Sequence, residues 1–123
     1  MKITLLGEDG IRLEDSAGRL TIEAPTADHA YGPFHMLASA LASCTFSVLQ
    51  SWASHAKLDA APLAVEVRWT FSEDPHRVGA MAVSLHWPGL PSERQASAKR
   101  AAAICGVHKT LEHPPAITVD LHA

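Results

Sequence analysis

The sequence predicts an α+β fold in a single domain that spans residues 1–123. Three observations favour this class. Apolar and polar residues alternate in short runs near the N-terminus and again between residues 63 and 87, which is typical of strands. A long apolar stretch with helical spacing begins at residue 33, and the two kinds of pattern occupy separate segments of the chain. At 123 residues, a chain can bury about two thirds of its unfolded surface, enough for a core without a disulfide or metal.

The N-terminal segment predicts three short strands. Residues 3–6 and 11–14 flank a turn over residues 7–10, whose Asp9-Gly10 pair is a strong hairpin signal. A second turn at residues 15–18 leads into an alternating run at 19–23. We therefore expect a small antiparallel meander.

The first helix is predicted to begin at Pro33, because proline has no N–H and the first helical turn does not need one. It should run to about Lys57. Alternating runs at residues 63–71 and 78–87 should then pair as a long hairpin.

The C-terminal third predicts two more helical segments and a strand. Ser92 and Gln95 have the spacing of a capping box that opens a second helix, and Gly106 is a plausible end for it. A short helical turn over residues 107–111 and an alternating strand at 116–121 should close the fold.

The long helix also carries information about assembly. One stripe holds Leu37, Leu41, Cys44, Val48 and Trp52 at spacings of three or four, and the opposite side is also largely apolar. A helix that is apolar nearly all round must be covered on every side. One sheet and one other helix can hardly do so in this chain, which favours an intertwined homodimer.

Composition argues against several functional classes. The formal net charge is −3 and aromatic residues make up 6% of the chain, so neither a basic face nor stacking platforms for nucleic acid are expected. The N-terminus has no apolar signal-peptide region, which predicts a cytoplasmic location. The long apolar helix is interrupted by serine, threonine and glutamine and falls short of a membrane span, so no membrane partner is expected.

The two cysteines leave several interpretations open. In a reducing compartment they are more often reduced or catalytically cycled than bridged. A buried Cys44 could simply be a small hydrophobe at a helix interface. Cys105, His108 and His113 have a spacing that could supply three ligands to zinc, although no fourth ligand is evident. We expect no metal and no cofactor.

Two segments together make the chain similar to a known family. The run GPFHMLASALASCT at residues 32–45, followed by CGVHKTL at residues 105–111, strongly resembles the OsmC/Ohr family of osmotically induced and organic-hydroperoxide-resistance proteins. The resemblance covers nearly the whole chain. It implies the OsmC/Ohr-like fold, with an N-terminal antiparallel meander, a long buried helix, a β-hairpin, a second helix and a C-terminal strand, in an intertwined homodimer.

The resemblance also implies an activity. Members of the family reduce organic or hydrogen peroxides through a peroxidatic cysteine, here Cys44, and a resolving cysteine, here Cys105. A sulfenic acid forms on the first sulfur and condenses with the second to a disulfide, which an external dithiol then reduces. An antioxidant role in the oxidative stress response follows. An apolar pocket around the thiol would favour organic hydroperoxides, and its expected lining is Phe34, His35, Leu41 and Val48.

The sequence departs from the family pattern at the expected active site. Active members place a glutamate nine or ten positions before the first cysteine, where it orients an arginine that stabilises the thiolate. Those positions hold His35 and Phe34 here. Arg12 and Arg19 are the candidates for the arginine, and we take Arg12. Without such a partner a buried thiol keeps a raised pKa, so the alternative is a noncatalytic dimer that binds a small apolar ligand or senses redox state.

Overall fold

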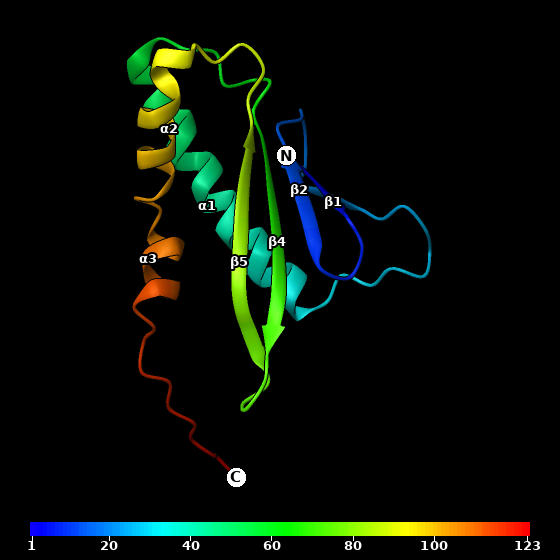
Figure 1. Cartoon of the computed structure of the whole chain (residues 1–123). Coiled ribbons are helices and arrows are strands. Elements are labelled where there is room, and N and C mark those ends of the chain that lie inside the picture. The colour runs from blue at the N-terminus through cyan, green and yellow to red at the C-terminus, as the bar shows by residue number, and fades with distance from the viewer.

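The computed structural model describes residues 1–123 and is a mixed α+β fold built on one five-stranded sheet (Figure 1). The strand order is β3-β1-β2-β4-β5. The strands are β1 (Lys2–Leu5), β2 (Gly10–Glu14), β3 (Thr21–Glu23), β4 (Ala64–Ser72) and β5 (Arg77–His86). The helices are α1 (Pro33–Ala56), a single 3₁₀ turn (Ser92–Arg94), α2 (Gln95–Ala102) and α3 (Gly106–Glu112). Helix α1 packs on the sheet, and α2 and α3 pack on α1.

Both predicted hairpins are confirmed, but the N-terminal meander is not. Strands β1 and β2 pair antiparallel, with Ile3 opposite Leu13, and β4 and β5 do the same over nine or more residues of each strand. Strand β3, however, pairs parallel with β1. The reason lies in the sheet order: β4 already occupies the second edge of β2, so the chain must cross to the free edge of β1.

Helix α1 forms the core with the inner face of the sheet. It begins at Pro33 as predicted and ends where Lys57 adopts a left-handed conformation. Phe46 and Leu49 are at most 1% exposed and pack against the buried side chains of β2 and β4. By length and composition α1 could cross a membrane. Its packing in this core identifies it instead as the central helix of a globular fold.

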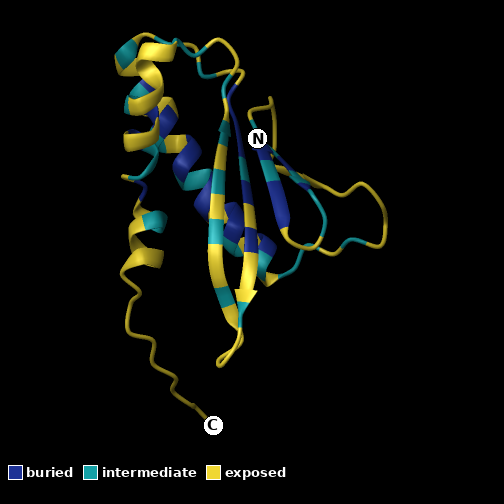
Figure 2. Ribbon diagram, viewed as in Figure 1, coloured by how far each residue is buried: buried dark blue, intermediate teal, exposed yellow.

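The inner face of β5 is much less covered than that of β4. Val65, Val67 and Trp69 in β4 are buried, whereas Met81 and Val83 in β5 are only partly buried (Figure 2). Strand β5 is also an edge of the sheet. This strip of half-exposed apolar side chains is one wall of the groove described below.

The C-terminal third differs from the prediction at three points. The Ser92–Gln95 capping box does not form: a 3₁₀ turn precedes α2, and neither element has a side-chain cap. Helix α2 ends at Ala102, so Cys105 lies beyond it.

The third difference is the predicted strand at 116–121, which is absent. Residues 114–123 are exposed and irregular, with Ile117, Val119 and Leu121 at 85%, 93% and 91% exposure. A strand needs a neighbour for its backbone groups, and no strand of this chain lies beside the tail (Figure 1).

Candidate active site

The structure brings Cys44 and Cys105 together, although they lie far apart in the sequence. Cys44 is half-buried in the middle of α1, on the side that faces α3. Cys105 is fully buried at the start of α3. The two thiols are close enough for a side-chain hydrogen bond, and both are free.

Cys105 is also the N-cap of α3. Its Sγ accepts a hydrogen bond from the backbone N–H of His108 at 3.4 Å, which satisfies one of the unpaired donors at the helix start. Gly106 therefore begins α3 and does not end the helix before it. The sequence marks this cap only by a cysteine between two short helical runs, a pattern that fits the end of the first run equally well.

The environment shifts the pKa values of the two thiols in opposite directions. Burial raises the pKa of Cys44, but hydrogen bonds from the Cys105 thiol and from the backbone N–H groups of Val107 and Gly106 outweigh it and lower that pKa. Burial also raises the pKa of Cys105, and the hydrogen bond to Cys44 raises it further. When one of the two thiols ionises, the environment therefore favours Cys44 as the thiolate and Cys105 as the proton donor to it.

Arg12, the arginine expected beside Cys44, does not lie near the cysteines. Its neighbours Ile11 and Leu13 are buried against the core, so the alternation of β2 places Arg12 on the opposite face of the sheet from α1. There it donates to Glu66 Oε1 at 2.9 Å and lies 3.6 Å from Glu14. No arginine lowers the pKa of Cys44.

Burial raises the pKa of Glu66, but Arg12 and His86 outweigh it and lower that pKa. His86 Nε2 lies 3.4 Å from Glu66 Oε2. These three residues form a polar network on the outer face of the sheet, away from the cysteines.

His35, at one of the family's glutamate positions, has a structural role. It is 7% exposed, and its Nδ1 accepts from the backbone N–H of Gly32 at 3.2 Å. Its Nε2 therefore donates to the carbonyl of Gly7 at 2.9 Å, and its ring meets Trp69 edge-on. The side chain ties the start of α1 to the β1–β2 turn.

A groove of about 660 Å³ lies between α1, β5 and α3, and we call it the α1–β5 groove. Phe34 and Leu41, two of the expected pocket residues, line it. His35 and Val48 do not; Val48 packs against the core. The other lining residues are Leu37, His76, Arg77, Val78, Gly79, Ala80, Met81, Val83, His108, Leu111 and Glu112.

A second, smaller pocket of about 300 Å³ lies on the other side of His108, which lines both. Thr45 and Lys99 also line it, and Thr45 Oγ1 is buried without a hydrogen-bond partner. The sequence gives no signal for Thr45 or Arg77, because a single threonine in an apolar helix and a single arginine at the start of a strand have no spacing pattern.

The histidine-rich C-terminal segment forms no metal site. No group of three or more His, Cys, Asp or Glu side chains is placed to hold an ion. His108 Nε2 instead lies 3.4 Å from Glu112 Oε1, and the Cys105 sulfur accepts from the backbone of His108.

Comparison with known proteins supports the fold. A solved structure from Psychrobacter arcticus 273-4, described as a "putative osmotic stress induced and detoxification response protein", is 21% identical, with a TM-score of 0.62 over 88% of this chain and 84% of its own. A "putative redox protein" from Lactobacillus casei ATCC 334 is 19% identical, with a TM-score of 0.59 over 74% and 66%. No curated protein matches.

These likenesses show the fold. The family model for OsmC-like protein matches residues 25–120, which include both cysteines. The chain is a member of the OsmC-like protein family.

Proposed function

We propose that this protein is a thiol-dependent peroxidase in which Cys44 attacks the peroxide and Cys105 resolves the product. The observation that supports it is the thiol pair itself: two free cysteines lie near each other, and their environment lowers the pKa of Cys44 and raises that of Cys105. A peroxidatic sulfur must be a thiolate, and a resolving sulfur must remain a thiol until it is needed.

The chemistry requires only these two sulfurs and a reductant. The Cys44 thiolate attacks the distal oxygen of a hydroperoxide, the O–O bond breaks, and the alkoxide leaves and takes a proton to become an alcohol. Cys44 is then a sulfenic acid. The Cys105 sulfur displaces its hydroxyl, which leaves as water, and a disulfide forms. An external dithiol reduces that disulfide by exchange and is itself oxidised.

Backbone donors take the place of the arginine in this proposal. The N–H groups of Gly106 and Val107 lower the pKa of Cys44 without any charged side chain. Neither cysteine lines the α1–β5 groove, but its apolar lining includes Leu41, three residues before Cys44 on α1. Such a lining near the thiol favours organic hydroperoxides over hydrogen peroxide. Recycling by a dithiol fits a reducing compartment, so a cytoplasmic location stays our prediction.

A homodimer is the second part of the proposal. Ile117, Val119 and Leu121 alternate with polar residues and are almost fully exposed, as a strand without a partner would be. The free edge of β5 offers unpaired backbone groups to such a segment from a second copy. The full chain should be a dimer by light scattering, and a chain that ends at residue 114 should be a monomer. A dimeric truncated chain would contradict the role of the tail.

The peroxidase proposal is tested by exposing fully reduced protein to one equivalent of cumene hydroperoxide at neutral pH. Intact mass and thiol counting should show that both thiols disappear, with the loss of two hydrogens and no added oxygen. Ser47→Ala, at an exposed position of α1, is the matched control and should behave in the same way.

Single cysteine variants separate the two roles. Cys44→Ser should consume no peroxide. Cys105→Ser should turn over once and accumulate a sulfenic acid on Cys44 that a dimedone probe traps. Full activity in Cys44→Ser, or two intact thiols in the treated wild type, would contradict the proposal.

The α1–β5 groove favours one alternative, a noncatalytic protein that binds a small apolar ligand or senses redox state. The same experiment discriminates between them. A ligand-binding protein keeps both thiols in the presence of peroxide. A sensor forms the disulfide, but a dithiol does not restore its thiols on the timescale of repeated turnover.

A further inference from the structure

The smaller pocket, of about 300 Å³, lies between α1, β5, α2 and α3, and we call it the Thr45 pocket. Apolar side chains of β5 and of the end of α2 form most of its walls. Only Thr45, Lys99 and His108 contribute polar side chains, and no acidic side chain lines it. The pocket therefore offers hydrogen-bond donors and a positive charge, but no negative charge.

The Thr45 hydroxyl is a buried polar group without a partner in the chain. Thr45 is 1% exposed, and its Oγ1 makes no hydrogen bond. A hydroxyl in a helix can donate to the carbonyl four residues earlier, as Ser39 of the same helix does to His35 at 2.7 Å. Thr45 does not, so its burial costs free energy that a bound acceptor would recover. Because Thr45 lines the pocket, a ligand there can supply that acceptor.

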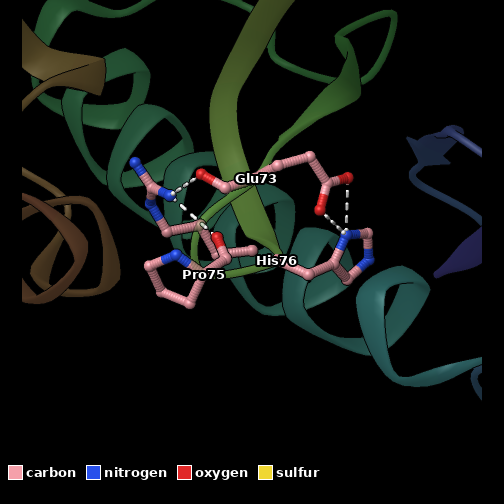
Figure 3. Close-up of polar contacts among 4 residues, drawn as sticks. Glu73, Pro75 and His76 are labelled. Carbon is pink, nitrogen blue, oxygen red and sulfur yellow. Dashed lines mark hydrogen bonds and ion pairs between the residues drawn. The ribbon is translucent and has the colours of Figure 1, made fainter.

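Lys99 is a cation without an acidic partner, since it forms no ion pair. The cations of the β4–β5 turn show the contrast. There, His76 Nδ1 lies 2.9 and 3.0 Å from the two carboxylate oxygens of Glu73 (Figure 3). Arg77 donates to the carbonyls of Glu73 and Pro75 at 3.0 and 2.8 Å (Figure 3). The ammonium of Lys99 therefore remains available to a ligand.

The Thr45 pocket adjoins both cysteines. Thr45 follows Cys44 directly in α1, and the backbone N–H of His108 donates to the Cys105 sulfur at 3.4 Å. The His108 side chain lies between this pocket and the α1–β5 groove, where its Nε2 is 3.4 Å from Glu112 Oε1. A ligand in the Thr45 pocket would therefore contact residues next to each sulfur without occupying the groove.

We propose that the Thr45 pocket binds a small oxyanion, a carboxylate or a phosphate, through the Thr45 hydroxyl and the Lys99 ammonium. Both groups donate hydrogen bonds, and hydrogen bonds to an anionic oxygen are stronger than those to a neutral one. The volume of about 300 Å³ limits the ligand to a compact one. The bound anion is an effector of the thiol pair, because a negative charge beside Cys44 disfavours its thiolate.

Binding is measured by titrating sodium acetate or sodium phosphate into reduced protein at low ionic strength. The amide resonances of Thr45, Lys99 and His108 report it, and acetamide is the neutral control ligand. At least one anion should shift these resonances to saturation, and acetamide should not. Binding of acetate alone would assign a carboxylate as the ligand, and binding of phosphate alone would assign a phosphate. No shift with either anion, or equal shifts with acetamide, would overturn the proposal.

Substitutions locate the bound anion. Thr45→Val should weaken binding about tenfold, since a hydrogen bond to a charged acceptor is worth about that factor. Lys99→Gln should weaken it about three- to fivefold, because an exposed ion pair contributes less. Arg100→Gln, at a neighbouring exposed position outside the pocket, is the matched control and should bind as wild type does. Unchanged affinity in a folded Thr45→Val would overturn the assignment. If Thr45→Val does not fold, equal affinities of Lys99→Gln and Arg100→Gln would overturn it.

Stability gives a readout that a purely structural threonine would not move. Without anion, Thr45→Val should unfold at a higher urea concentration than wild type, because valine replaces an unpaired buried hydroxyl. A saturating anion should then stabilise wild type more than Thr45→Val, because it binds the folded wild type more tightly. Equal stabilisation of the two proteins at every anion concentration would contradict the role of the hydroxyl.

The effect on the thiols is measured in Cys105→Ser, in which Cys44 is the only cysteine. A saturating anion should slow iodoacetamide alkylation of Cys44 by about two- to fivefold at neutral pH, because like charges repel at this separation. The effect should disappear when Thr45→Val is added. Alkylation at the same rate with and without a bound anion would overturn its role as an effector. Neither binding nor alkylation involves a peroxide, so these results do not depend on the proposed peroxidase activity.

Discussion

The proximity of the two thiols predicts that the ionisation of Cys44 depends on Cys105, even without a disulfide. Burial raises the pKa of Cys44, and the Cys105 thiol is the largest of the three donors that lower it. A hydrogen bond to a charged group contributes about 1.5–3 kcal/mol. Because Cys44 is only half-buried, we take the lower end of that range, which corresponds to about a tenfold change in thiolate population.

Two substitutions, Cys105→Ala and Cys105→Ser, test whether the Cys105 side chain lowers the pKa of Cys44. Alanine removes both the donor to Cys44 and the cap of α3. Serine keeps a hydroxyl that can donate to Cys44, and it is a preferred N-cap residue. Cys105→Ala should therefore alkylate about tenfold more slowly at neutral pH than Cys105→Ser.

The assay is the rate of iodoacetamide alkylation as a function of pH, which reports only Cys44 because each variant has a single cysteine. In Cys105→Ser the rate should rise with pH with its midpoint below the ordinary thiol value of 9.0, because a lowered pKa places the thiolate at lower pH. In Cys105→Ala the whole profile should move to higher pH. Identical profiles for the two variants would refute the role of Cys105 as a donor.

Three further predictions concern stability. Glu66→Gln should lower the free energy of unfolding by about 1 kcal/mol at neutral pH. Because the folded pKa of Glu66 is lowered, its contribution is present above the pKa of the unfolded chain and is lost as the pH falls through the folded value. Urea unfolding at neutral pH and in acid should therefore show the difference only at neutral pH. Phe46→Ala, at 1% exposure, should cost about 3–5 kcal/mol by urea unfolding, whereas Met36→Ala, at 53% exposure, should change little; similar losses would contradict the described core. In Gly79→Ala the new Cβ would collide with the Ser72 side chain, so the variant should lose about 1–3 kcal/mol. Adding Ser72→Gly should restore part of that loss in thermal unfolding, and no restoration would contradict the clash.

Local signals in the sequence predicted most elements, because hairpins and the long helix are encoded by nearby residues. The Asp9-Gly10 turn lies between β1 and β2, and Pro33 begins α1. The partner of β3 could not be predicted in this way. Whether it joins β2 or β1 depends on β4, which follows about forty residues later and takes the free edge of β2.

The candidate site was likewise predictable only in part, because some of its features depend on contacts between distant segments of the chain. Cys44 and Cys105 came from the resemblance to the family, and the structure places them side by side. The donors that lower the pKa of Cys44 are backbone groups, and a sequence does not mark which N–H groups will face a sulfur. The prediction of Arg12 is wrong because the sequence does not show which face of β2 it occupies, and that face is decided by the burial of its neighbours Ile11 and Leu13.

The position of His35 also limits which side chains this site can hold. Its ring both accepts from Gly32 and donates to the Gly7 carbonyl. An ionised glutamate at position 35 could accept from Gly32, but it has no proton for Gly7 and would face its carbonyl oxygen. A carboxylate at this position would therefore require a simultaneous change in the β1–β2 turn. The histidine and the turn constrain each other, so an acidic group that orients a cation near the thiols is easier to place at another position than at 35.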